Sequence, residues 1–193
     1  MASAPPGPPD APATDLSGLS ASVDRLTRHA TDWSTRRLLD EGLDLVRDVS
    51  WADASALLRI RRDQVTVLHT RPIAIADPPD PCPDHAGDAE LTPPIATPLP
   101  LDWFPWGLAP IRADRFMLVD DARNLPVSPH GHRTLGSLGI RSCLHLPLRQ
   151  RGRAVGAVHV FWSEPRLAWD DDRGRLLRTL GRFLLSCADR EHV

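Results

Sequence analysis

Apolar residues recur every three or four positions in three stretches of the chain, at about residues 16–33, 34–49 and 170–187. This spacing places apolar side chains along one face of an α-helix, so it predicts three helices. The third stretch opens with Asp170, Asp171 and Asp172. Acidic residues favour the N-terminus of a helix, and we therefore interpret these aspartates as a cap rather than a metal site.

Two hairpins are predicted between the helices. Residues 54–60 form a compact apolar run, four polar residues follow, and residues 65–70 alternate in polarity. Residues 140–148 and 154–162 form a second pair of strands joined at Arg151 and Gly152, a typical turn sequence. A short strand at 116–119 and a short helix at about 130–138 lie between the two hairpins. Hairpins imply an antiparallel sheet that helices can cover on one face, which is an α+β domain.

The pattern also divides the chain. Residues 1–14 are rich in proline, alanine and glycine and are expected to be a disordered tail. Residues 15–31 form an N-terminal helix that either dimerises or folds back onto its own domain. The globular domain follows at 32–190. We expect a homodimer held by the two terminal helices, with Leu19 and Leu26 among the contacts.

Residues 71–111 break all periodicity and are rich in proline. A long irregular segment in a compact domain is often a lid or a binding loop. This one carries Trp103, Phe104 and Trp106, and large aromatic side chains gain much from burial. We expect Trp103 and Trp106 to lie over a ligand pocket.

Composition removes several classes of function. All 23 basic residues are arginine, so mechanisms that require a lysine are excluded. The formal net charge is −2 and the arginines are dispersed among acids rather than gathered on one stripe, so we expect no nucleic-acid partner. The sequence shows neither a secretory signal nor a run of about 18 apolar residues, which predicts no membrane segment. Three widely spaced cysteines are typical of a reducing compartment, and a cytoplasmic location follows.

The second hairpin and its surroundings resemble the GAF domain family. The similarity is carried by residues 138–142, 144–148 and 152–158, by Val119 and Asp120 after a short strand, by the strand that follows Trp51, and by the closing helix. The resemblance extends over about residues 32–188. It implies an antiparallel sheet of about six strands, with terminal helices on one face and a small-molecule pocket on the other.

The resemblance also implies a function. Members of the family sense small molecules or act as dimerisation modules, and they usually pass a signal to an output domain. We expect no output domain in this chain, so a signal would leave through a partner signalling protein or a changed oligomer. The lysine of cyclic-nucleotide members is missing, as are the thioether cysteine and the tyrosines of bilin-binding members. The cofactor or ligand therefore stays unidentified.

The alternation of residues in the second hairpin gives the candidate site. Leu144, Leu146 and Leu148 point to one face of the sheet, and the neighbouring residues point to the other. Facing strands bring side chains together across the hairpin. We predict that the ligand cavity is lined by Cys143, His145, His159 and Phe161, together with Trp103 and Trp106.

Three functions are consistent with these residues. The first is a non-catalytic small-molecule sensor, in which both histidines are neutral wall residues; metal or haem ligation by them stays open. The second is a dimerisation or protein-interaction module whose pocket side is filled by its own side chains. The third is a redox enzyme that uses Cys143, although a cysteine on an apolar strand is normally inert.

Overall fold

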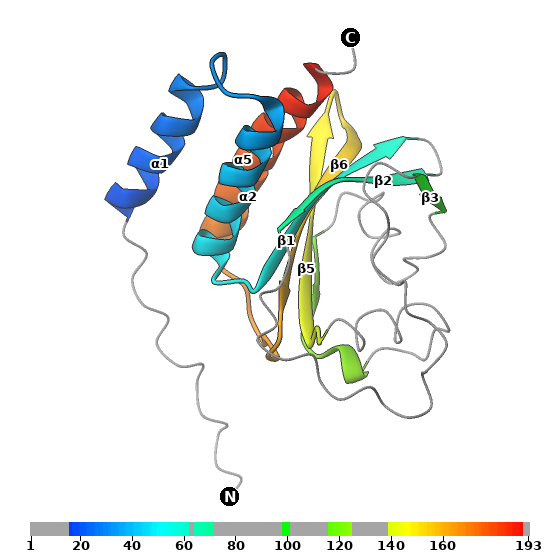
Figure 1. Ribbon diagram of the computed structural model, residues 1–193. Helices are drawn as coiled ribbons and strands as arrows, with labels where there is room; N and C mark the ends of the chain where they lie inside the picture. The colour runs from blue at the N-terminus through cyan, green and yellow to red at the C-terminus, as the bar shows by residue number, and fades with distance from the viewer. Residues whose placement is uncertain (1–15, 62–63, 72–97, 101–115, 125–138, 191–193) are drawn as a thin grey trace, which may run out of the picture.

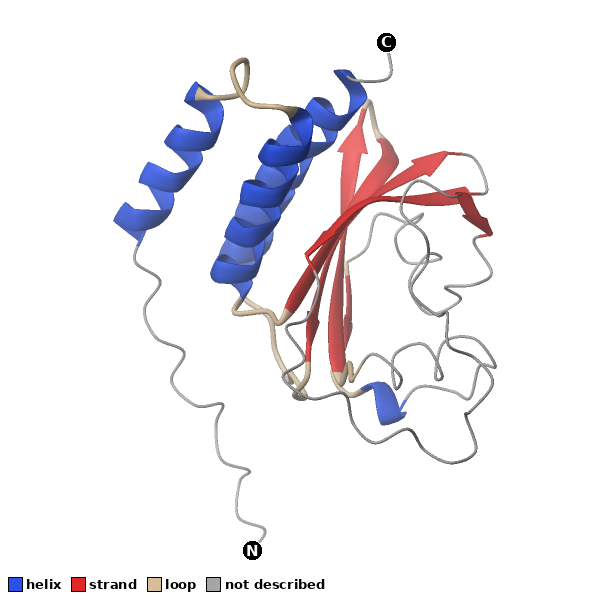
Figure 2. Ribbon diagram, in the orientation of Figure 1, coloured by secondary structure: helices blue, strands red, loops and turns tan. Residues whose placement is uncertain are grey.

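In the computed structural model, three helices lie on one side of an antiparallel sheet (Figures 1 and 2). The structure describes residues 16–61, 64–71, 98–100, 116–124 and 139–190. The helices are α1 (Leu16–Arg28), α2 (Thr35–Ser50) and α5 (Asp171–Arg190). The predicted α+β class is confirmed, and the three helices predicted from apolar periodicity are present.

The described part of the chain contributes six strands in the order β3-β2-β1-β6-β5-β4. Every neighbouring pair is antiparallel. The two predicted hairpins are β1–β2 and β5–β6, and they form the central part of the sheet. The strands are β1 (Ala54–Arg61), β2 (Gln64–Arg71), β3 (Pro98–Pro100), β4 (Met117–Val119), β5 (Ser142–Gln150) and β6 (Arg153–Trp162).

Local sequence signals explain the helix ends. The hydroxyl of Ser34 accepts a hydrogen bond from the backbone N–H of Arg37 and begins α2. The helix ends at Trp51, which adopts the left-handed conformation with φ of 49°. At α5 the carboxylate of Asp170 accepts from the backbone N–H of Asp172 at 2.8 Å. Asp170 is therefore a helix cap, as predicted for the aspartate triplet.

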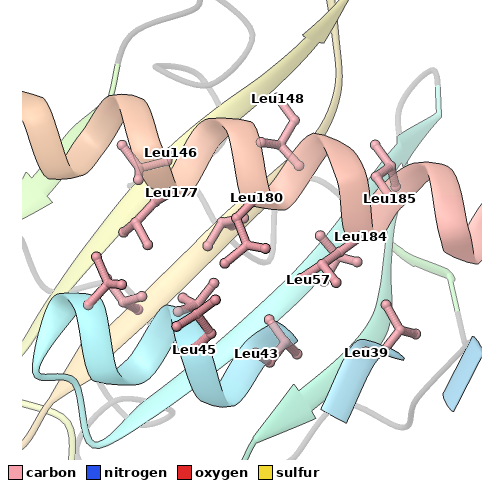
Figure 3. Close-up of a cluster of buried hydrophobic side chains, with 14 of the residues drawn as sticks. Leu39, Leu43, Leu45, Leu57, Leu146, Leu148, Leu177, Leu180, Leu184 and Leu185 are labelled. Carbon is pink, nitrogen blue, oxygen red and sulfur yellow. The ribbon is translucent and has the colours of Figure 1, made fainter. Parts of the chain in front are cut away.

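The main hydrophobic core lies between the sheet and the helices α2 and α5 (Figure 3). Leu144, Leu146 and Leu148 of β5 are fully buried in it, which confirms their predicted orientation. Trp162 at the end of β6 is 2% exposed, and its indole N–H donates to the carbonyl oxygen of Ser50 at 3.2 Å. The predicted apolar face of the second hairpin therefore packs on the helices.

Helix α1 packs on its own domain. Leu26 is 1% exposed and belongs to the main core, and Arg25 forms an ion pair with Glu41 of α2 at 2.9 Å. The assignment of Leu26 to a dimer contact is therefore wrong, because its side chain is already buried within one subunit. The helix also ends at Arg28, before Trp33, which lies in the following turn and stacks on His29. The dimer itself stays a prediction.

A β-bulge in the β1–β2 pair turns side chains of β2 from the far face of the sheet toward the helices. Leu58 faces Val67, but Leu57 faces His69, so one extra residue of β2 is accommodated between them. The side chains of His69 and Arg71, which follow the bulge, consequently point to the helices. His69 contacts Asp40 at 2.9 Å, and Arg71 binds Asp44 of α2 through two hydrogen bonds of 2.7 Å. Hydrogen bonding by His69, together with the positive charge of Arg71, lowers the pKa of Asp40.

Replacing Gly156 by alanine should destabilise the fold by about 1–3 kcal/mol, because overpacking at a rigid contact forces the backbone to move. A Cβ atom at this position would lie 2.5 Å from the backbone oxygen of Leu58 in the neighbouring strand. Gly42→Ala is the comparison, since its new methyl group meets only the flexible side chain of Leu184 and alanine favours the helix. Urea unfolding should rank Gly156→Ala as the more damaging change; the reverse order would contradict this reading of the packing.

Some predictions lie outside the described residues. They are the tail at 1–14, most of the proline-rich segment with Trp103 and Trp106, and the short helix at 130–138. Among the helices that the structure describes, none combines the length and apolar character needed to cross a bilayer.

Candidate functional site

Four of the six predicted site residues lie together on the sheet face that points away from the helices. In the register of β5 and β6, His145 faces His159 and Cys143 faces Phe161. The first three side chains are buried, with exposed fractions of 0% for Cys143, 0% for His145 and 4% for His159. We call Cys143, His145, His159 and Phe161 the histidine cluster. Its predicted assembly is confirmed, whereas its contact with a ligand stays a prediction.

Short contacts connect the polar members of the histidine cluster. The thiol sulfur of Cys143 lies 3.3 Å from Nε2 of His145, and Nδ1 of His145 lies 2.9 Å from Nε2 of His159. The two imidazole rings meet edge to face, with centroids 3.9 Å apart and planes at 89°. The ring of Phe161 then packs edge-on against His159, with centroids 6.0 Å apart. Both ring nitrogens of His145 are thus engaged within the cluster.

Burial makes the cluster electrically neutral. It lowers the pKa of His145 to about 3, and burial together with the neighbouring His145 lowers the pKa of His159 well below its usual value. Burial also raises the pKa of the Cys143 thiol to about 12. At neutral pH the site therefore holds two neutral imidazoles and one protonated thiol.

A neutral imidazole has one N–H donor and one acceptor nitrogen. The contacts therefore form a directed chain. In one arrangement, Cys143 donates to His145 and His145 donates to His159; in the other, both bonds are reversed. Reversal changes the last nitrogen of the chain, Nδ1 of His159, from a donor to an acceptor. The site can thus present either kind of group to a ligand without changing its net charge.

The chemistry of Cys143 and the histidines limits their roles. A thiolate is the reactive form of cysteine, and the raised pKa disfavours it. The direct hydrogen bond between the imidazoles holds a proton between the two nitrogens, so these atoms cannot both face one metal ion. Within the described ranges, no group of three or more His, Cys, Asp or Glu residues is arranged to hold a metal ion.

Apolar residues surround the cluster on this face. Ala56 of β1 lies opposite His159, and Met117 of β4 lies opposite His145. Two small apolar clusters flank the histidines, and Phe161 packs against both of them. Neither Ala56 nor Met117 is predictable as a neighbour of the histidines from sequence, because cross-strand neighbours outside a hairpin follow only from the sheet order. Alternation alone would have placed both residues on a strand face, without naming their partners.

The family profile described as GAF domain matches residues 33–184. The chain belongs to the GAF domain family. The predicted resemblance is thereby confirmed over nearly the whole globular domain. A comparison with curated proteins gives no match.

Solved GAF domains share the fold of this one. The phycoerythrobilin-bound GAF domain from a cyanobacterial phytochrome superposes with a TM-score of 0.62 at 13% identity, covering 92% of this chain and 100% of the other. The GAF domain of an Acinetobacter phosphoenolpyruvate-protein phosphotransferase gives 0.56 at 14% identity, covering 92% and 93%. The GAF domain of the cyanobacteriochrome TePixJ gives 0.58 at 16% identity, covering 84% and 94%. At these identities the similarity establishes the fold.

Proposed function

We propose that this GAF domain is a non-catalytic sensor that binds a small molecule on the sheet face carrying the histidine cluster. The observation that carries the proposal is the pair of buried, neutral and mutually hydrogen-bonded imidazoles of His145 and His159. Small-molecule sites are mostly apolar and contain a few placed polar groups. The histidine cluster, flanked by apolar residues, matches that description.

The electrostatics indicate the chemical class of the ligand. A neutral site gives little stabilisation to a buried charge, because burial of an unpaired ion is costly. The ligand should therefore be largely apolar, with an uncharged polar group that hydrogen bonds to Nδ1 of His159. Trp103 and Trp106 are proposed to contact the apolar part of the ligand. Bilins bind similar folds, but this chain lacks tyrosine, and its ligand is proposed to be of another kind.

The non-catalytic assignment rests on Cys143. Its thiol is buried and its pKa is raised, so the redox-enzyme alternative has no activated nucleophile here. In the alternative of a ligand-free interaction module, the protein's own side chains cover the histidine cluster in place of a ligand. A cytoplasmic location, a homodimer and a partner signalling protein belong to the proposal.

Native mass spectrometry of the protein purified from its own host tests the proposal, because it reports bound ligand and oligomer together. The unmodified protein should carry a small molecule. The double variant His145→Leu/His159→Leu should lower ligand occupancy or affinity by about tenfold or more, since it removes the hydrogen-bonding end of the chain. Replacing both histidines keeps the fold, because no single imidazole is left buried without its partner.

The matched control is His29→Gln/His69→Gln, which removes two histidines outside the cluster: His29 stacks on Trp33, and His69 contacts Asp40 of α2. It should retain the ligand. A protein that carries nothing, and that binds nothing in a metabolite screen, would contradict the sensor and favour the interaction module. Equal loss of ligand in both double variants would contradict the assignment of the ligand site to the sheet face that carries the histidine cluster.

A further inference from the structure

A second concave site lies in the other layer of the molecule, between α5 and the second half of β5. Its volume is about 310 Å³, and its described lining consists of Pro147, Leu148, Arg149, Arg178 and Arg182. Figure 3 shows Leu146 and Leu148 on the side of α5 opposite the leucines of α2. We call this site the arginine pocket; its described lining shares no residue with the histidine cluster.

The packing of α5 places two arginines at this pocket. Arg178 and Arg182 are four residues apart, so their side chains leave the helix on the same side, one turn apart. Between them Gly181 is buried, and a Cβ atom there would lie 2.9 Å from Leu148 and would also overlap Val158. The absence of a side chain at Gly181 thus lets the helix backbone approach the sheet closely. That approach holds the two arginines beside β5.

In the part of the chain that the structure describes, no carboxylate forms an ion pair with Arg178 or Arg182. Two aspartates of α5 pair with other arginines, Asp172 with Arg175 and Asp189 with Arg59 of β1, and Asp170 just before the helix pairs with Arg173. Arg149 also lines the pocket. Like charges gathered around a concave, partly apolar site raise the local concentration of anions.

We propose that the arginine pocket binds a small phosphorylated compound, with Arg178 and Arg182 holding the phosphate. Guanidinium groups donate parallel hydrogen bonds to phosphate oxygens, and such charge-assisted bonds are among the strongest in proteins. Pro147 and Leu148 are the apolar residues of the described lining, and they would contact the remainder of the compound. The inference does not depend on the proposed sensor function, because Arg178 and Arg182 belong to α5 and neither lies in the histidine cluster.

A small compound fits this site better than an acidic protein surface does. The volume lies at the lower end of that of small-molecule pockets, about 300–1,000 Å³. A protein partner would instead meet a broader flat area. The concave shape and the arginines that line it match one phosphate or pyrophosphate group with a small attached body.

Calorimetric titration of the full chain with pyrophosphate tests this proposal. The unmodified protein should bind pyrophosphate in the millimolar range or tighter, with affinity that falls as salt rises. Arg178→Gln/Arg182→Gln should weaken binding by about tenfold or more, because each charge-assisted hydrogen bond contributes substantially. The matched control Arg36→Gln/Arg175→Gln removes the same charge from exposed positions outside the pocket and should bind like the unmodified protein.

Three results would overturn the proposal. They are no pyrophosphate binding by the unmodified protein, equal weakening in both double variants, and binding of polyglutamate without binding of pyrophosphate. The last would identify an acidic polypeptide as the occupant. Both variants change exposed or half-buried side chains, and circular dichroism should confirm that they fold. Ligand occupancy at the histidine cluster should be the same in Arg178→Gln/Arg182→Gln, so the two proposals can fail separately.

Discussion

Lowering the pH below about 6.5 should destabilise the folded protein well before its carboxylates are protonated. His145 and His159 are neutral in the folded state, because burial lowers the pKa of both imidazoles, that of His145 to about 3. In the unfolded chain each imidazole has its usual pKa of about 6.5. Between these two values the unfolded chain binds protons that the folded chain does not. The stability that the neutral, buried histidines contribute is therefore fully present above about pH 6.5, and it is lost progressively as the pH falls toward their folded-state pKa values.

The expected size of this effect is about 1 kcal/mol per pH unit for each histidine, measured as the free energy of unfolding in urea at about pH 7 and about pH 5. The pKa values of Asp40 and Asp121 are lowered from 3.8, so these carboxylates affect stability only below about pH 4. Asp40 is held by His69 and Arg71, and Asp121 by Arg141 and Arg123. The interval between pH 5 and pH 7 thus isolates the histidines.

The double variant His145→Leu/His159→Leu should remove most of this dependence, and His29→Gln should leave it unchanged. His29 lies in the turn after α1, stacked on Trp33, and is partly exposed. An unmodified protein that is equally stable at both pH values would show that the imidazoles reach solvent and titrate in the folded state. The buried hydrogen-bonded pair would then be an incorrect description of the site.

Replacing Trp162 by alanine should cost about 3–5 kcal/mol of stability, as large truncations in a packed core do. The ring is 2% exposed, lies 5.9 Å from that of Trp169, and bonds to the last turn of α2 through Ser50. Its removal leaves a cavity and an unpaired carbonyl oxygen where β6, α2 and the loop before α5 meet. The cavity cannot be filled without moving the sheet against the helices.

Thermal unfolding of Trp162→Ala, Trp162→Phe and Trp33→Ala checks this expectation. Trp162→Phe keeps most of the ring and loses the hydrogen bond, so its loss should be intermediate. Trp33 is only partly buried and contacts Arg37 and His29 at the surface, so its truncation should cost less than about 2 kcal/mol. Similar losses for Trp162→Ala and Trp33→Ala would contradict the central position of Trp162.

Periodicity was sufficient to predict the second hairpin of this domain. Leu144, Leu146 and Leu148 alternate strictly with Cys143 and His145, so the sheet faces follow from periodicity. The two-residue turn alone would pair His145 with Val158; the register shift between Leu148 and Arg149 moves the pairing by one residue and brings His145 opposite His159. The histidine cluster was predictable for the same reason, since all four of its residues lie in one hairpin.

Longer-range relations could not be predicted in this way. The stripe on α1 has the same spacing whether it meets a second subunit or its own domain, and the sequence left both open; the burial of Leu26 favours the second. In the sequence the arginines are dispersed among acids, yet Arg178, Arg182 and Arg149 line one pocket because α5 packs closely on the sheet at Gly181. Their four-residue spacing was the available signal, but it indicates a pocket only when the strand beside the helix is known.

Because of its bulge, β2 contacts both layers of the domain: its first half packs beside the histidines, and its last residues contact α2. Before the bulge, Val65 and Val67 pack in the small apolar cluster beside the histidines, on the proposed ligand face. Four residues after Val67, Arg71 donates hydrogen bonds to Asp40 and Asp44 of α2. A compound that displaced Val67 would therefore shift β2 relative to α2 through the ion pairs of Arg71 rather than through apolar packing. Arg71 is the position at which such motion could be uncoupled from the helices while the binding face stayed intact.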